Sequence, residues 1–420
     1  MKKRNKKSFS RLLCAALAVC LLLSLGGCKK TESKGSLDNE GFGTTDITAR
    51  SSYAVETAAP GDENMKLVIA RCGDTELTNE QFAVYYWMEF YNFINFASNY
   101  GVSPDAFGLS TDKPLDQQES IAPIDENDEN SDAMTWEQYF IEAALTSYQK
   151  SRGLAQAAAA AGFTLEEDQQ KTIDELETTM EEDAKQAGYD SADAYVQASF
   201  GDGVTLADYQ SYLRTYYTAY AYSESLKDVD LTEQELADYF DKNLELIHEK
   251  YQKGIERLND VTIRHILIEP EVADGEEEAT DEAWAAAETE ANRIYEQWKE
   301  NPTEDNFSEL AKQYSADGNA DEGGIYEDVY PGQMVETFND WCFDSSRKTG
   351  DSGIVKTKFG YHIMYFVETT DSKTWQDVAK NAYGSELADA EIAKYPTEVN
   401  YRNIRVFDLV SASAVKEAEK

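Results

Sequence analysis

The fold is decided by a short apolar stretch in the second half of the chain, VTIRHILI at residues 261–268. Its side chains alternate as in a β-strand, so one face would carry Val261, Ile263, His265 and Leu267. The chain has 420 residues, enough for two or three domains. At this strand the pattern of the chain changes from mainly helical to mixed helix and strand.

The residues after this strand predict a compact α+β domain. Amphipathic spacing indicates helices, and apolar runs beside glycine indicate strands. The predicted elements are helices over 284–298 and 307–314, a loop punctuated at 323–324 and 331–332, a short helix around Phe338, and strands over 353–357 and 362–367. This β-α-α-α-β-β order is typical of a small antiparallel sheet with surrounding helices.

The residues before the strand predict a mainly helical domain. Its predicted elements are a strand over 67–71, an aromatic-rich helix that begins at a capping box of Thr78 and Gln81, a long loop over 101–133, and nearly continuous helix over 136–253 with a further capping box at Thr232 and Glu235. A last helix is expected over 375–394, followed by a strand over 399–409 that would pair with 67–71.

Aromatic side chains recur at helical spacing in this domain, as at Tyr209, Tyr216 and Tyr220. Two interpretations are open. These stripes can be the core of the helical domain, or part of this surface can be exposed and hold unfolded proteins. A helical period defines a face but not what covers it.

The N-terminus predicts export and lipid attachment. Residues 1–11 are basic, and residues 12–25 form an apolar run shorter than the roughly 20 residues of a membrane-spanning helix. The run ends in LGGC, which resembles the lipobox of bacterial lipoprotein precursors, with Cys28 as the lipidated residue. An ordinary signal peptide with an incidental cysteine is the alternative. Residues 29–62 are polar and without period, which indicates a flexible tether.

The predicted fold class is α+β, with the small-sheet domain inserted in the mainly helical domain. The predicted organisation is a signal peptide over 1–27, a tether over 28–62, the first part of the helical domain over 63–258, the α+β domain over 259–370, and a closing helix and strand over 371–420.

Composition excludes several classes of function. The chain has 80 acidic and 38 basic residues and a formal net charge of -42, a field that repels phosphate backbones and excludes a nucleic-acid binder. Five cysteines and three histidines leave little room for a disulfide framework or a zinc enzyme, so no metal site is expected. Cys72 and Cys342 are expected to be unpaired thiols.

Six short motifs in the α+β domain occur in the order found in one enzyme family. They are RHIL at 264–267, FSELA at 307–311, YSAD at 314–317, GG at 323–324, GQM at 332–334 and FGYHI at 359–363. Together they resemble the parvulin family of peptidyl-prolyl cis-trans isomerases. With the lipobox and the flanking domain, the whole chain is similar to the PrsA-type foldase lipoproteins of Gram-positive bacteria, with a SurA-like helical chaperone domain.

The resemblance implies roles for individual residues. His265 and His362 would be the paired histidines of the catalytic site, and Asp317 the acidic residue beside the substrate carbonyl. The implied substrate-binding residues are Met334 and Phe338, which would grip the proline ring, with Tyr326, Thr357 and Phe359. No cofactor is implied, because isomerisation only requires rotation about an amide bond, over a barrier of roughly 18–20 kcal/mol.

The chain departs from the parvulin pattern at Tyr326 and in the stretch 343–350, which is longer than usual. Tyr326 stands where a leucine normally lines the proline pocket. The pocket is therefore expected to be narrower, and turnover weaker.

Two functions remain open on this sequence. The first is a peptidyl-prolyl isomerase and foldase for exported proteins with X-Pro bonds, held by lipid on the outer face of the bacterial cytoplasmic membrane. The alternative is a non-catalytic holdase chaperone in which the parvulin domain is structural. Under both functions the partners are unfolded or partly folded proteins and the membrane. Neither function defines whether the protein is a monomer or an oligomer such as a dimer.

Overall fold

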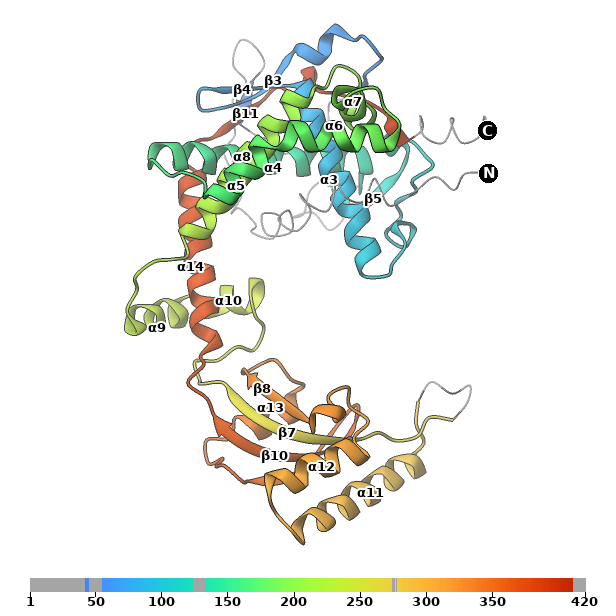
Figure 1. Cartoon of the computed structure of the whole chain (residues 1–420), viewed down its shortest axis with the longest axis vertical. Coiled ribbons are helices and arrows are strands. Elements are labelled where there is room, and N and C mark those ends of the chain that lie inside the picture. Colours follow the sequence, from blue (N-terminus) through green and yellow to red (C-terminus); the bar gives the residue numbers. More distant parts are fainter. Residues whose placement is uncertain (1–41, 45–54, 124–132, 274–275, 277, 411–420) are drawn as a thin grey trace. The chain divides into compact units, whose positions relative to one another are not determined.

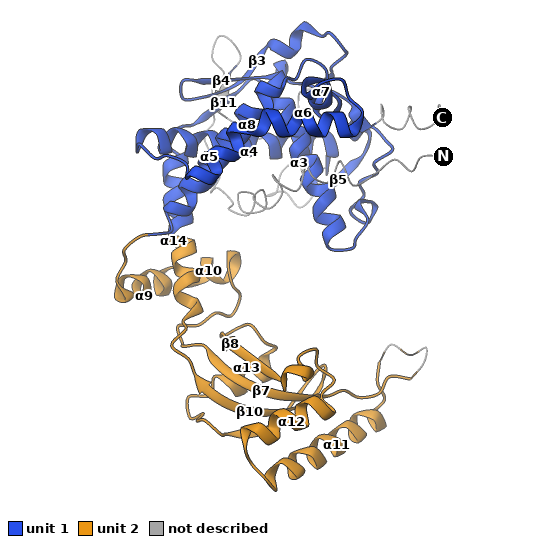
Figure 2. Ribbon diagram, viewed as in Figure 1, with its two compact units in different colours: residues 1–228, 384–420 blue, residues 229–383 orange. Residues whose placement is uncertain are grey.

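The computed structural model describes most of the chain, namely residues 42–44, 55–123, 133–273, 276 and 278–410 (Figure 1). The chain divides into two compact units (Figure 2). Unit 1 runs to residue 228 and resumes at 384, and unit 2 comprises 229–383. Among the described residues, no helix combines the length and the apolar character needed to cross a membrane.

Unit 1 contains a four-stranded sheet. Its order is β1 (Gly43–Thr44), β11 (Thr397–Val399), β3 (Val68–Cys72) and β4 (Thr75–Thr78). The predicted pairing of a C-terminal strand with residues 67–71 is confirmed, because Val399 pairs with Ala70 and Thr397 with Cys72 in antiparallel register.

The predicted single strand over 399–409 is wrong. The Asn400 side chain accepts a hydrogen bond from the Arg402 N–H and opens a 3-10 turn, η5 (Tyr401–Asn403). The chain then forms the short strand β12 (Arg405–Val406), which pairs in parallel with β2 (Glu56–Thr57). A turn made by the Asn400 side chain therefore interrupts an apolar alternation that predicts one continuous strand.

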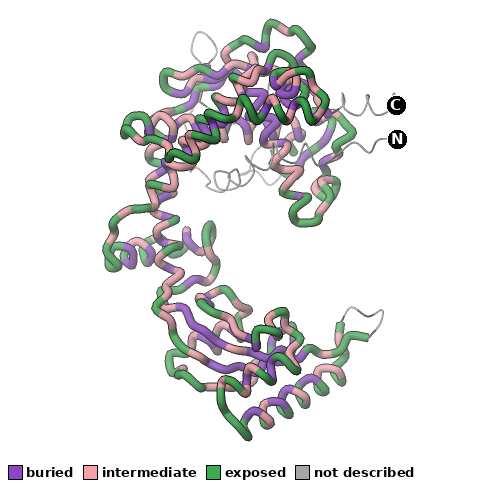
Figure 3. Tube along the Cα trace, viewed as in Figure 1, coloured by how far each residue is buried: buried purple, intermediate pink, exposed green. Residues whose placement is uncertain are grey.

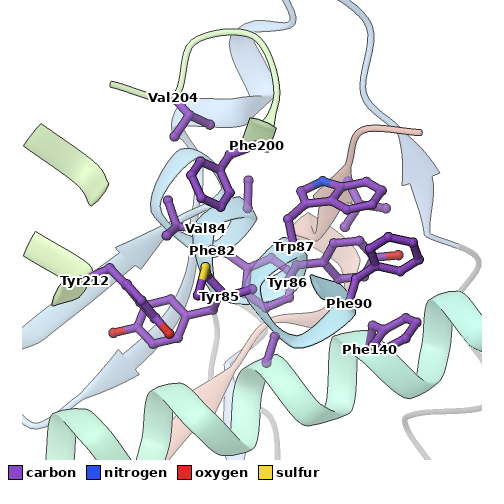
Figure 4. Close-up of a cluster of buried hydrophobic side chains, with 14 of the residues drawn as sticks. Phe82, Val84, Tyr85, Tyr86, Trp87, Phe90, Phe140, Phe200, Val204 and Tyr212 are labelled. Carbon is purple, nitrogen blue, oxygen red and sulfur yellow. The ribbon is translucent and has the colours of Figure 1, made fainter. Parts of the chain in front are cut away.

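Three long helices build the core of unit 1. They are α3 (Asn79–Asn99), α4 (Trp136–Ala160) and α8 (Leu206–Ser225). The predicted capping box of Thr78 and Gln81 is confirmed at the start of α3. Figure 4 shows the aromatic side chains of α3 packed among those of the other helices, and the rings of Tyr85 and Tyr212 meet edge to face at 4.8 Å. Most of the aromatic stripe is therefore core.

The shorter helices α5 (Glu167–Asp174), α6 (Leu176–Ala187) and α7 (Ala192–Phe200) complete the helical part of unit 1. The predicted long loop over 101–133 is wrong in part. It contains η2 (Pro104–Phe107), η3 (Leu115–Gln117) and a strand pair, β5 (Glu119–Pro123) with β6 (Ala133–Thr135). The Gln118 side chain organises the segment, because its amide donates to Ser110 O and Lys113 O and accepts from the Ser110 N–H.

Unit 2 contains a four-stranded antiparallel sheet. Its order is β8 (Ile325–Val329), β7 (Val261–Ile268), β10 (Gly360–Thr369) and β9 (Ser352–Thr357). The helices around it are α11 (Asp281–Lys299), α12 (Glu304–Tyr314) and α13 (Glu336–Cys342). The predicted α+β class is confirmed, with a small antiparallel sheet and a mainly helical unit.

Strand β8 was not predicted, so the β-α-α-α-β-β order is wrong. The observed order is β-α-α-β-α-β-β. Edge strand β8 pairs only with β7, carries exposed Glu327 and Asp328, and bends where Asp328 has a φ of 48°. A charged, bent edge strand lacks the apolar alternation by which strands are recognised.

Nearly all of the central strand β7 is buried (Figure 3). Within this strand only Arg264 is partly exposed. One face packs against α11 and α12 through Ile266, Trp298 and Phe307. The opposite face packs against α13 through Ile263 and Phe338. The sheet is thus the middle layer of unit 2, and His265 lies in that layer.

Two further helices, α9 (Glu233–Lys242) and α10 (Leu244–Lys250), also lie in unit 2. They pack on Trp375 at the start of α14 (Thr374–Ile392). The capping box of Thr232 and Glu235 is confirmed at the start of α9. The compact unit therefore begins 30 residues before 259, where the sequence places the boundary of the α+β domain, because these helices share an apolar cluster with α14.

The two ends of the α+β segment meet at Asp260, which is wholly buried. Its backbone N–H donates to Ser372 O, and its backbone carbonyl accepts from the Thr370 N–H. Its carboxylate accepts from Ser372 Oγ at 2.6 Å and from Thr374 Oγ1 at 2.8 Å, and also from the Thr374 N–H. One side chain thus fastens the entry and exit of the segment and caps α14.

We expect Asp260→Ala to lower the free energy of unfolding of unit 2 by about 1–3 kcal/mol, because it leaves buried donors without an acceptor. Urea unfolding followed by circular dichroism and by hydrogen exchange within unit 2 measures this. Asp371→Ala, at an exposed aspartate in the same turn, is the matched control and should change stability by less than about 0.5 kcal/mol. Equal stability of the two variants would contradict the role given to Asp260.

Candidate active site

The centre of the site is a pair of buried histidines on neighbouring strands. The register of β7 and β10 pairs His362 with Leu267 and Met364 with His265, so the two histidines are diagonal neighbours on one face of the sheet. Their Nδ1 atoms lie 3.2 Å apart, within hydrogen-bonding distance. His265 is 2% exposed and His362 is 5% exposed. Antiparallel pairing therefore brings together two imidazoles that are 97 positions apart in sequence.

Thr357, at the end of β9, lies on the far side of His362. Its Oγ1 is 2.8 Å from His362 Nε2, and it accepts a hydrogen bond from the Phe359 N–H at 3.1 Å. With that N–H as donor, the hydroxyl proton is available for His362 Nε2, and His362 Nδ1–H can donate to His265 Nδ1. This arrangement places the remaining proton of His265 on Nε2, which faces Asp317.

Asp317 follows α12 in a loop that is fastened to β7. Ser315 Oγ accepts from the N–H groups of Leu267 and Asp317, and the Ala316 N–H donates to Leu267 O. The Asp317 Oδ2 atom lies 3.6 Å from His265 Nε2, an ion-pair distance but longer than a hydrogen bond. Asp317 is thus the partly exposed charge at the edge of the histidine pair.

Aromatic and apolar side chains cover the histidines. The ring of Phe338 meets the rings of His265 and His362 edge to face, at 5.4 and 5.2 Å. Met334 and Tyr326 are partly buried and pack in the same apolar cluster. The Tyr326 hydroxyl donates to Asp317 Oδ1 at 3.0 Å.

The structure therefore brings together most of the residues that the resemblance implied. They are His265, His362, Asp317, Thr357, Tyr326, Met334 and Phe338. Phe359 differs, because its side chain is 50% exposed and lies beside Lys358 rather than in the cluster, and only its backbone joins the site. Cys28 lies outside the described residues.

Sequence reasoning gave no role to three residues that hold the site, although Ser315 and Gly324 lie in the quoted motifs. Ser315 and Asn319 fasten the Asp317 loop, the latter through a side-chain amide that donates to Ile325 O. Gly324 accepts from the His265 N–H at 2.8 Å, has a φ of 69°, and could not carry a Cβ without collision with His265 O. The glycine pair at 323–324 was the available signal, since a positive φ and close backbone approach both require glycine.

Burial controls the charge of the histidine pair. Loss of hydration lowers the pKa of His265 to about 4, although the nearby Asp317 carboxylate acts in the opposite direction. Burial likewise lowers the pKa of His362 to about 4. Both imidazoles are therefore neutral at pH 7, and burial raises the pKa of Tyr326 to about 12, so its hydroxyl stays protonated.

Other chemistries find little support in the part of the chain that the structure describes. It holds no group of three or more His, Cys, Asp or Glu side chains arranged for a metal ion. Cys72 and Cys342 are buried free thiols, and burial raises the pKa of Cys342 to about 12. What the arrangement provides is a buried, neutral, hydrogen-bonded pair of histidines with one carboxylate at its edge and apolar side chains packed over it.

Comparison with known proteins identifies this part of the chain. Residues 265–368 match the model of the rotamase family, described as a PPIC-type PPIase domain. The chain contains a parvulin-type rotamase domain. The matched residues include every member of the site described above, from His265 on β7 to His362 on β10.

Beyond the rotamase domain the similarity is partial. Foldase protein PrsA 1 of Listeria monocytogenes is 30% identical over 146 residues, which are 34% of this chain and 40% of that protein. Chaperone SurA of Methylococcus capsulatus is 30% identical over 36% of this chain and 31% of its own length. The solved structure of PrsA from Bacillus cereus matches with 18% identity and a TM-score of 0.28, covering 74% of this chain and all of that one. The identity to foldase protein PrsA 1 confirms the predicted resemblance to the PrsA-type foldases, while the chain spans less than half the length of these two curated relatives.

The histidine pair should make stability depend on pH. A histidine whose pKa is lower in the folded state binds fewer protons than in the unfolded state, so the folded state loses stability as the pH falls from about 6.5 toward 4. The loss is on the order of 3 kcal/mol for a fully shifted histidine. We expect the unfolding free energy of wild type to fall more steeply between pH 7 and pH 5 than that of His265→Asn, as measured by urea unfolding.

The comparison needs a control because the chain carries many other acidic groups. His248→Gln changes the one histidine outside the site and should keep the wild-type slope. Parallel curves for wild type and His265→Asn would contradict a neutral buried pair.

Proposed function

We propose that this protein is a peptidyl-prolyl cis-trans isomerase and a foldase for exported proteins. The observation that carries the proposal is the buried, neutral pair of His265 and His362 beneath Phe338, with the Asp317 carboxylate at its edge. The rotamase-family match over 265–368 and the similarity to PrsA foldases support it.

The chemistry of the reaction suits this site. Planar amides carry more charge separation than twisted amides, so a dry apolar site favours the twisted form relative to water. Phe338 and Met334 would hold the proline ring, so rotation would move the acyl part of the preceding residue. No proton has to leave the substrate, and the neutral histidines would form a rigid floor that excludes water.

The substrate-side role of each residue follows from its place. Asp317 is partly exposed and would lie near the carbonyl that rotates, while Thr357 would act behind the histidines by holding their tautomers. Phe359 would contact a peptide only at the rim of the site, since its ring is half exposed.

The partners of this activity would be unfolded or partly folded proteins with X-Pro bonds. We propose that the protein meets them outside the cytoplasmic membrane, anchored by a lipid on Cys28. Uncatalysed X-Pro isomerisation takes tens of seconds or more, which exposes an exported chain to aggregation and proteolysis.

Met334→Ala should reduce kcat/KM for a proline peptide by about tenfold, because it removes apolar contact with the proline ring worth about 1.4 kcal/mol. The purified full chain is assayed by a protease-coupled or NMR exchange measurement. Phe338→Ala is a poorer test, since Phe338 is only 3% exposed and truncation of a buried phenylalanine costs about 3–5 kcal/mol of stability.

Ile354→Ala is the matched control for Met334→Ala. Ile354 is a partly buried apolar residue of the same sheet that packs in the cluster on the α11 side. It should retain the wild-type rate. Equal rates for all three proteins would show that Met334 does not line the substrate pocket.

Cys28→Ala should abolish lipid attachment, because no other residue of the lipobox carries a thiol. The expected result is an unprocessed or released protein, detected by fractionation of cells and by mass spectrometry of the N-terminus. Full retention of a mature Cys28→Ala protein in the membrane fraction would rule out the proposed anchor.

One observation favours the alternative, a holdase with a structural rotamase domain. The Tyr326 hydroxyl occupies one oxygen of Asp317, and the side chain packs in the apolar cluster that contains Phe338. Under that alternative the purified chain would suppress aggregation of an unfolded protein but would show no isomerisation above the uncatalysed rate.

A further inference from the structure

Tyr326 contacts both His265 and Asp317. It comes from the edge strand β8, and its ring lies 5.1 Å from the ring of His265 at an angle of 32°. Its hydroxyl donates to Asp317 Oδ1 at 3.0 Å. One side chain therefore packs on the histidine and binds the carboxylate that faces this histidine.

The histidine and the carboxylate do not complete a hydrogen bond with each other. His265 Nε2 is buried and has no hydrogen-bond partner among the described residues, although Asp317 Oδ2 lies only 3.6 Å away. A buried polar atom without a partner is costly, so a free carboxylate would turn to close this gap. Another contact must therefore keep the Asp317 carboxylate away from His265 Nε2.

Two donors hold the other oxygen of the carboxylate. The Asn319 N–H donates to Oδ1 at 3.2 Å from within the same loop, and the Tyr326 hydroxyl donates to it from a different element. The Asn319 bond comes from the same loop as Asp317, whereas the Tyr326 bond joins the carboxylate directly to the edge strand β8. Both bonds are strengthened by the charge of the carboxylate, and the Tyr326 bond is the shorter one, at 3.0 Å against 3.2 Å.

We propose that Tyr326 is a positioning residue of this site: its hydroxyl holds the Asp317 carboxylate short of a hydrogen bond with His265, and so keeps the histidine pair neutral in mildly acidic conditions. The inference rests on the proposed isomerase function for its effect on turnover, but not for its effect on the histidine.

Few titratable groups among the described residues face His265. They are His362 from β10, Asp317 from the loop after α12, and Tyr326 from β8, while α13 contributes only the ring of Phe338. Removal of the hydroxyl would let Asp317 accept a hydrogen bond from His265 Nε2–H. A carboxylate that accepts a hydrogen bond from a histidine stabilises the protonated form of that histidine. His265 would therefore take up a proton at a higher pH than it does in wild type.

Tyr326→Phe tests this, because it deletes the hydroxyl and keeps the ring over His265. In the full chain, the titration of the His265 ring nitrogens is followed by NMR, which has only three histidines to resolve. The proton affinity of His265 should rise at least threefold, a shift of about half a pH unit or more. The acid limb of the profile of kcat/KM against pH should shift in the same direction.

Tyr295→Phe is the matched control. It removes a hydroxyl that bonds Ser352 Oγ at 3.0 Å in the same domain, away from the histidines, and should leave the titration unchanged. In an Asp317→Asn background, Tyr326→Phe should produce no shift, because the carboxylate through which it acts is absent.

Superimposed titrations of wild type and Tyr326→Phe would overturn the proposal. If the chain has no isomerase activity, the NMR titration still decides the positioning role, so the two failures are distinguishable. If Tyr326→Phe does not fold, Tyr326→Leu replaces it and must shift the His265 titration in the same direction. A shift that persists in the Asp317→Asn background would also refute the mechanism.

Discussion

The site depends on the antiparallel pairing of β7 with β10. Opposite Leu267 this register places His362, and opposite His265 it places Met364, so the two imidazoles share one face of the sheet. A slip of one residue would turn every side chain of a strand to the opposite face. His265 would then face α11 and α12, and the bond between the two Nδ1 atoms could not form. Apolar burial on both faces of β7 enforces the register, because any slip would also misplace Ile263 and Ile266.

The same burial sets the electrostatics of the site. A chain with a net charge of -42 surrounds two histidines that are neutral, because the loss of hydration outweighs the attraction of the nearby carboxylate. The charge at this place is confined to Asp317, which is partly exposed and bound by the Tyr326 hydroxyl. A reaction that consists of rotation about an amide bond is served by such a neutral, dry floor rather than by strong acids or bases.

The site is stabilised by residues beside it and by a residue at the far end of the α+β segment. Ser315 and Asn319 hold the loops beside β7 through side-chain hydrogen bonds to backbone groups, and Gly324 does so through its carbonyl, so these residues set the path of the chain and take no part in chemistry. At the other end of the segment, Asp260 joins its entry to its exit and caps α14. The insertion is therefore closed by one buried carboxylate whose partners come from residues 372 and 374.

Much of this molecule could be predicted from local pattern. Capping boxes at Thr78 and Thr232, the strand over 261–268 and the six rotamase motifs are short-range signals, because they depend on residues a few positions apart. The strand β8, the turn at Asn400 and the buried amide of Gln118 could not be recognised, since their stability comes from partners distant in sequence or from single side-chain bonds. The motifs named His265, His362 and Asp317, and the departure from the parvulin pattern named Tyr326, but only the tertiary structure decided how these four residues meet. Which oxygen of Asp317 faces His265, and that Tyr326 binds the other, depends on distances of a few ångströms between three separate elements, and no pattern along one chain encodes such distances.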